Sequence, residues 1–153
     1  MSVMSTLNVS ASGMTAQRTR MDLIAQNIAN VNTTRTDDNK PYVRQTVVFK
    51  ERSQDNTNFD KALTSAQTGV GYKKNVGTGV KIDKIVEDHV TAMKKVYDPN
   101  HPDADEEGYV TYPNVDTVTE MTNLIDANRS YEANVTAFNA TKNMLLKALD
   151  IGG

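Results

Sequence analysis

The acidic turn that begins at Asp98 holds the side chains best suited to bind a metal ion. Asp98, Asn100 and one of two later aspartates could offer the oxygen ligands that Ca²⁺ prefers. The EF-hand template fails, however, because Pro102 occupies its fifth position, Asp103 replaces the glycine of its sixth and Tyr109 replaces the glutamate of its twelfth. We therefore expect a solvated turn and no metal, with a calcium-binding module as the alternative.

Two histidines and a glycine cluster are the other candidates for catalysis or phosphate binding. His89 and His101 lack a neighbouring serine nucleophile or a second histidine at ligand spacing, so we expect both at the surface. No Lys-Ser/Thr pair follows the glycines as a P-loop requires, so we expect loop glycines. These are Gly69, Gly71, Gly77 and Gly79. With no cysteine for thiol chemistry either, the sequence indicates a protein that is not an enzyme and holds no cofactor.

The composition indicates a thin hydrophobic core. The chain has 153 residues, of which 38% are hydrophobic and 24% charged, whereas typical globular chains are about 45–50% apolar. The net charge of -2 and the sequence pI of about 5.7 lack the basic excess of a nucleic-acid binder. The sequence has no apolar run long enough to predict membrane insertion, and its first residues lack the pattern of a secretory signal. We expect an elongated protein that partners complete.

The elements that must position any site begin with a helix over residues 4–30, within a first region of residues 1–33. Apolar side chains recur there at the 3-4 spacing of a coiled-coil seam, which Arg18 interrupts. The expected seam residues are Met4, Leu7, Ala11, Met14, Met21, Ala25 and Ile28. Alanine is small and methionine is flexible, so a seam built from them packs weakly, and this helix needs a partner to supply much of the buried surface.

Residues 34–112 predict a β-rich middle region. β-branched and aromatic residues indicate strands near residues 42–49, 80–86, 93–97 and 108–112. Residues 51–79 are rich in polar residues and glycine, and predict a long flexible loop.

A second long helix is expected in the closing region, residues 113–153. Asn114, Asp116 and Thr117 are candidate caps, and Thr117 with Glu120 has the spacing of a capping box. The seam expected on this helix consists of Met121, Leu124, Tyr131, Val135, Phe138, Leu145 and Leu149. Asn128 and Lys142 also fall on the seam, where they either escape to its edge or control the register. The predicted fold is α+β, with the two terminal helices pairing as a coiled coil.

Several motifs resemble those of bacterial flagellar rod and hook proteins, and most specifically proximal rod members. The end of the first helix resembles their ANxxT motif, with the matching residues Asn27, Ala29, Asn30 and Thr33. Residues 40–44, 96–110, 113–116 and 129–134 and the pair Glu120-Met121 are similar to the proximal rod pattern almost residue by residue.

This resemblance implies a structural subunit of the flagellar basal-body rod, which polymerises into a helical tube that transmits torque and conducts exported subunits. The terminal helices would line the inner tube and the β-rich region would face outward. The implied partners are copies of the chain, other rod proteins and the flagellar type III export apparatus, with no nucleic acid. The implied location is the basal body in the cell envelope and periplasm, reached without a cleaved signal peptide. A generic coiled-coil adaptor is a further alternative.

Phe59 and Leu63 stand out in the loop because they are apolar and four residues apart, the spacing of one helix face. Local packing beneath the β-rich region is the favoured interpretation. The alternative is a recognition element for the export gate, similar to the Phe-x-x-x-hydrophobic signals of rod and hook substrates.

Overall fold

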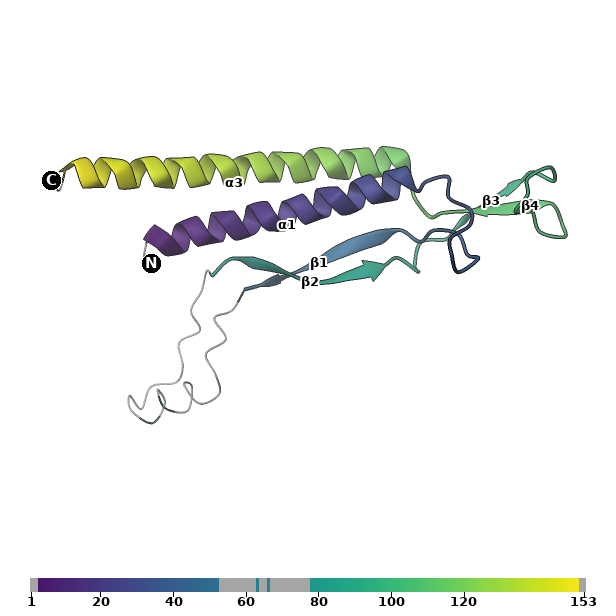
Figure 1. The fold of residues 1–153 in the computed structure, drawn as a ribbon, viewed down its shortest axis with the longest axis horizontal. Helices are drawn as coiled ribbons and strands as arrows, with labels where there is room; N and C mark the ends of the chain where they lie inside the picture. The colour runs from purple at the N-terminus through teal and green to yellow at the C-terminus, as the bar shows by residue number, and fades with distance from the viewer. Residues whose placement is uncertain (1–2, 53–62, 64–65, 67–77, 152–153) are drawn as a thin grey trace.

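The computed structural model describes residues 3–52, 63, 66 and 78–151, and for Val3 only the backbone. Two long helices, α1 (Val3–Ala29) and α3 (Thr117–Ile151), lie side by side, with two small antiparallel sheets between them in the sequence. α1 is the middle layer, packed against α3 on one side and against the first sheet on the other (Figure 1). The α+β prediction is confirmed at this level.

The two sheets are hairpin-like pairs of strands. β1 (Gln45–Glu51) pairs with β2 (Val80–Glu87), with a register shift between Val48 and Phe49. β3 (Lys94–Tyr97) pairs with β4 (Tyr109–Tyr112) beyond the end of the helices. All four expected strands are present. β1 begins later than predicted because the Tyr42 N–H donates to the Thr33 carbonyl instead of to a neighbouring strand.

The helices run antiparallel in one register along their shared length. Asn27 bonds Glu120 near one end, and Gly13 lies against Asn134 farther along. A Cβ on Gly13 would stand 2.7 Å from Asn134 Oδ1, so only glycine allows this approach without a shift of that side chain. The buried residues of α3 are Glu120, Ala127 and Thr141, and with Asn134 they form a seven-residue repeat facing α1.

The cap of α3 corrects the predicted capping box of Thr117 and Glu120. The Thr119 N–H and hydroxyl both donate to Asp116 Oδ2, and the Glu120 N–H donates to the Asp116 carbonyl. Asp116, the second of the expected caps, is therefore the N-cap. Its hydrogen bonds from Thr119 hold the pKa of the Asp116 carboxyl below its usual value. Glu120 lies one position too far along for a capping box, and its side chain is buried elsewhere.

The first sheet is fastened to α1 through Ser12. The Ser12 hydroxyl accepts a hydrogen bond from the Val80 N–H at 3.1 Å and donates to the Val9 carbonyl at 2.7 Å. Gly79, with φ of 108°, brings the backbone so close to Ser12 that a Cβ at this position would collide with the Ser12 hydroxyl oxygen. Neither long helix, over the ranges that the structure describes, is apolar enough to cross a membrane.

Candidate functional site

Asn27, near the end of α1, is the centre of a buried polar cluster that we call the junction. Asn27 is only 1% exposed. Its Nδ2 donates to the Gln45 carbonyl at 2.9 Å and to Glu120 Oε2 at 3.1 Å, while its Oδ1 accepts from the Tyr42 hydroxyl at 2.8 Å and the Gln45 N–H at 3.0 Å. All four hydrogen bonds available to an asparagine side chain are formed. One amide therefore ties α1, β1 and α3 together.

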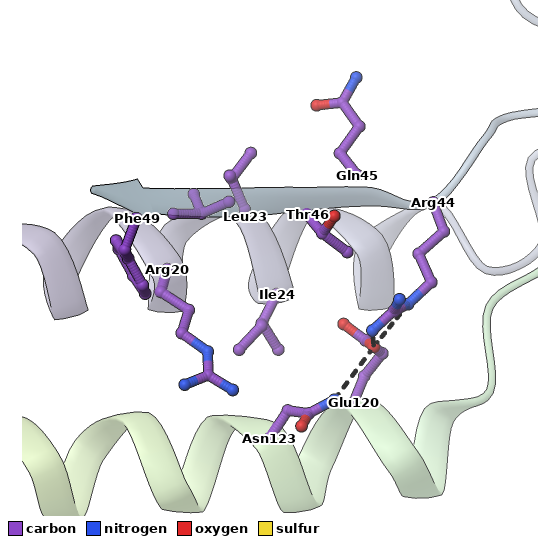
Figure 2. A pocket seen from close by; sticks show the side chains of 10 residues that line it. Arg20, Leu23, Ile24, Arg44, Gln45, Thr46, Phe49, Glu120 and Asn123 are labelled. Carbon is purple, nitrogen blue, oxygen red and sulfur yellow. Dashed lines mark hydrogen bonds and ion pairs between the residues drawn. The ribbon is translucent and has the colours of Figure 1, made fainter. Parts of the chain in front are cut away.

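Glu120 supplies a buried negative charge to the junction, and it is also 1% exposed. Arg44, just before β1, donates to Glu120 Oε1 from Nε at 2.9 Å and from Nη2 at 2.7 Å (Figure 2). The third guanidinium nitrogen, Nη1, lies 3.4 Å from Asp88 Oδ2. A carboxylate removed from water requires such a partner, because an unpaired buried charge costs several kcal/mol, on the order of 3–5 when one partner is deleted.

Asn114 extends the junction to the segment that enters α3. Its Oδ1 accepts from the Arg44 N–H at 2.9 Å, and its Nδ2 donates to the carbonyls of Asp88 at 2.6 Å and Thr91 at 3.2 Å. The end of β2 is thereby joined to the start of β1 and to the α3 linker. The six junction residues are Asn27, Tyr42, Arg44, Asp88, Asn114 and Glu120.

The electrostatics of the junction favour one protonation state. Burial raises the pKa of Tyr42, and the nearby carboxylates of Glu120 and Glu87 raise it further, so its hydroxyl stays a donor. The Thr91 N–H and hydroxyl, the Val90 N–H and Arg44 together lower the pKa of Asp88. At neutral pH the Tyr42 hydroxyl is thus held neutral and the Asp88 carboxylate charged, which suits a rigid brace and not proton transfer.

Sequence reasoning did not bring the junction together, although most of its members lie in the motifs that carried the resemblance. Arg44 and Glu120 are 76 residues apart, and Asn27 and Glu120 are 93 apart. The sequence offered one signal for the burial of Glu120: it lies seven residues before Ala127, so both side chains lie on the same face of the helix. The Asn30 and Thr33 side chains instead close the turn after α1, where Thr33 Oγ1 donates to Asn30 Oδ1. Ala29 is exposed.

The predicted seam residues are mostly only partly covered. On α1, Met4 and Ala25 are exposed, and the others are half-buried. On α3, Met121 and Leu149 are exposed, and Leu124, Tyr131, Val135, Phe138 and Leu145 are half-buried. The remaining α1 seam residues are Leu7, Ala11, Met14, Met21 and Ile28. Asn128 and Lys142 are exposed, as expected of polar side chains that escape to the edge of the seam.

The carboxylates of the acidic turn accept hydrogen bonds from its own backbone and from Thr34. Asp98 Oδ1 accepts from the Asn100 N–H, Asp105 Oδ1 accepts from the Glu107 and Tyr109 N–H groups, and Asp103 Oδ2 accepts from the Thr34 hydroxyl. Among the described residues, no cluster of three His, Cys, Asp or Glu side chains could hold a metal ion.

The histidines differ in their surroundings. His89 is exposed beside Glu87, as expected. His101 departs from that expectation, because it is half-buried against the Tyr112 ring and its Nδ1 accepts the Asp103 N–H. Gly69, Gly71, Gly77 and Phe59 lie outside the described residues, and Leu63 is 45% exposed.

Comparison with known proteins decides the family. Residues 7–35 match the family model of flagella basal body rod proteins, and residues 106–151 match the model of the C-terminal part of the flagellar basal body rod FlgEFG proteins. The chain is 49% identical to the flagellar basal-body rod protein FlgC of Bacillus subtilis (strain 168), over 99% of both chains. The chain belongs to the FlgC family of flagellar basal-body rod proteins.

Other FlgC proteins agree along the whole length. That of Borreliella burgdorferi is 42% identical over 99% of this chain and 98% of its own. That of Escherichia coli O6:H1 is 37% identical over 99% of both chains. As an FlgC-family member the chain is a structural rod subunit of the flagellar basal body and not an enzyme. The calcium-binding and generic adaptor alternatives find no support.

Proposed function

We propose that this chain polymerises with neighbouring rod subunits into a helical tube, in which α1 and α3 form the inner wall by coiled-coil packing. The observation that carries the proposal is the apolar surface left uncovered on both helices. Met4 on α1 is 68% exposed, and Met121 and Leu149 on α3 are 56% and 70% exposed, whereas the buried hydrophobic residues among those described are only five. These are Ala16, Leu23, Ile24, Val110 and Ala127. Such uncovered helix faces are typical of surfaces that partners complete.

The contact between α1 and α3 leaves the apolar seam available. The residues of the α3 repeat facing α1 are small or polar, and Gln17 Oε1 on α1 is buried without a hydrogen-bond partner in the described part of the chain. An unsatisfied buried oxygen weakens a contact by about 1–3 kcal/mol. The leucines and methionines beside this contact are therefore free to pack against neighbouring subunits, which supports assembly seams on both helices.

The same proposal assigns three regions to the chain. Residues 1–33 and 113–153 belong to the inner tube layer, and residues 34–112 form the outer region. The flexible loop expected over residues 51–79 begins within β1 and lies mostly outside the described residues. The separation of the β3–β4 pair from the helices supports this division (Figure 1). Torque passes between the layers through the junction, where buried charged and amide groups resist rotation of one layer against the other.

Substitution of exposed seam residues tests the assembly. Met121→Asp and Leu149→Asp each put a charge where the isolated chain tolerates it, because both side chains are exposed. We expect normal stability of the purified chain but loss of rod incorporation and motility, since a neighbour would have to desolvate the charge. Asn139→Asp, at another exposed position of α3, is the matched control. Motile cells with both seam variants in their rods would refute the proposal.

Export through the flagellar type III apparatus without a cleaved signal peptide, toward the periplasmic part of the basal body, is part of the same proposal. Phe59 and Leu63 form the candidate recognition element, and the exposure of Leu63 is compatible with contact by a receptor. Phe59→Ala with Leu63→Ala should leave the chain stable in the cytoplasm but block its secretion. Normal secretion of this double variant would eliminate the element while leaving the assembly proposal intact.

A further inference from the structure

A cavity of about 250 Å³ opens beside the junction, between α1, β1 and the start of α3. Leu23 and Ile24 of α1 and Val47 and Phe49 of β1 give it apolar walls. Figure 2 shows Arg20 reaching from α1 toward α3 beside Ile24 and Phe49. Among the described residues, Arg20 has no hydrogen-bond or ion-pair partner. The rest of the lining is polar, and its one carboxylate, Glu120, is already paired with Arg44. The cavity therefore offers an apolar wall next to a guanidinium that none of the described residues pairs.

The size and charge of this cavity select its occupant. It is smaller than the ~300–1,000 Å³ of small-molecule sites, but it exceeds the ~150 Å³ cavity that holds one benzene ring. One or two aliphatic side chains would fill it. A guanidinium beside an apolar wall pairs most favourably with a carboxylate. The matching partner is thus an apolar segment that carries an acidic residue.

The opposite end of the helix pair carries such a segment. Because Gly13 lies against Asn134 and the helices are antiparallel, Val3, ten positions before Gly13, faces the position ten after Asn134, Met144. The last turns of α3 thus project beyond α1 (Figure 1). Leu146, Leu149 and Ile151 are exposed there. Asp150, also exposed, has no partner among the residues described.

We propose that the cavity receives the projecting C-terminal end of the corresponding helix of an adjacent rod subunit, with Arg20 pairing with its carboxylate. The inference rests on the proposed function. The cavity lies near the end of α1 and the start of α3, whereas the projecting end of α3 is at the opposite end of the helix pair (Figure 1). A neighbour displaced along the helix axis therefore presents one to the other. The family model that matches residues 106–151 is named for other rod proteins, so those proteins share the helix in which this segment lies. Such a head-to-tail contact does not close on itself and extends a helical assembly.

Site-specific photo-crosslinking tests the contact in living cells. With p-benzoylphenylalanine in place of Phe49, an aromatic wall of the cavity, irradiation should yield adducts whose second peptide is the C-terminal helix of a rod subunit, identified by mass spectrometry. The same amino acid at Val90, which is 96% exposed, is the matched control and should not capture that segment. Recovery of the wild-type chain in isolated rods is scored first, because its absence would refute the proposed function and not this contact alone.

Charge substitution supplies the second measurement. Arg20→Glu should lower the amount of chain in isolated rods roughly tenfold or more, because two carboxylates would then meet in an apolar cavity. Arg20→Lys, which keeps the charge, should retain a substantial part, and Lys84→Glu on exposed β2 should assemble normally. Thermal unfolding of the purified Arg20→Glu chain confirms that it folds. The proposal would be overturned if the adducts formed at position 49 never contained a C-terminal helix. It would also be overturned if the Arg20→Glu chain were as abundant in isolated rods as the wild-type chain.

Discussion

At the scale of single residues, the Glu120 carboxylate is held inside the protein by the Arg44 guanidinium. Removing the cation alone should be far more harmful than removing the charge pair, because the carboxylate would remain buried without compensation. We expect Arg44→Met to lower the free energy of unfolding by about 3–5 kcal/mol. The double variant Arg44→Met with Glu120→Gln should recover part of that loss. Urea unfolding of the purified chain measures both.

The ion pair between Lys50 and Asp83 is the control for this prediction. Its atoms lie 3.7 Å apart, and both side chains are largely exposed. Lys50→Met should change the free energy of unfolding by less than about 1 kcal/mol, because water already solvates the separated charges. Equal losses in Lys50→Met and Arg44→Met would show that the junction is not the brace described above.

Tyr42 makes stability depend on alkaline pH. Its pKa is raised in the folded chain, so folding favours the neutral phenol. The contribution is complete below the ordinary value of about 10 and is lost as the pH rises through the higher folded pKa. At neutral pH, Tyr42→Phe should cost about 0.5–1.5 kcal/mol through the lost hydrogen bond to Asn27. The stabilities of wild type and variant should then begin to converge above about pH 10. A constant difference in urea unfolding from neutral to alkaline pH would contradict this.

At the scale of elements, the helices and strands could be predicted because each is encoded by spacing within its own segment. The repeat of apolar residues placed the first helix to within a residue and indicated the second within the closing region, and β-branched runs marked all four strands. The junction could not be predicted in this way, because Glu120 had an adequate local interpretation as a capping residue. Its role depends on Asn27 and Arg44, which only the folded arrangement brings near. The face of α3 that packs on α1 lies one position from the predicted seam, so that Ala127 is buried and Asn128 is exposed. This difference could not be predicted either, because it too depends on the folded arrangement.

The close approach of the helices at Gly13 gives a prediction at this scale. Alanine is favoured over glycine in a helix by about 0.8–1 kcal/mol, but here its Cβ would displace the Asn134 side chain. Gly13→Ala should therefore be nearly neutral by itself. In an Asn134→Ala background, which removes the obstructing atoms, the same change should raise the free energy of unfolding by about 1 kcal/mol. If Gly13→Ala has the same effect in both backgrounds, the two positions are not in contact.

At the scale of the whole molecule, stabilising contacts are unevenly distributed along the helix pair. The junction, the cap at Asp116 and the buried Leu23 and Ile24 lie toward one end. Toward the other end, the contact between α1 and α3 relies on small and polar residues, and the last turns of α3 project beyond α1. An isolated helix of this kind is marginal in water. The single chain is thus braced at one end of the helix pair, and the proposed assembly would have neighbouring subunits stabilise the other.

Amide hydrogen exchange should reveal this gradient. In a dilute monomer, amides of residues 20–28 and 121–128 should exchange much more slowly than those of residues 5–10 and 144–151, because opening is least costly where few contacts are broken. Asn27→Ala should accelerate exchange at the braced end and flatten the gradient, whereas Asn139→Ala, at an exposed position of α3, should leave it unchanged. In isolated rods both ends should be protected, since neighbours then cover the helices. Strong, uniform protection in the monomer would mean that the chain completes its own core, and the apolar side chains on its helices would need an explanation other than assembly.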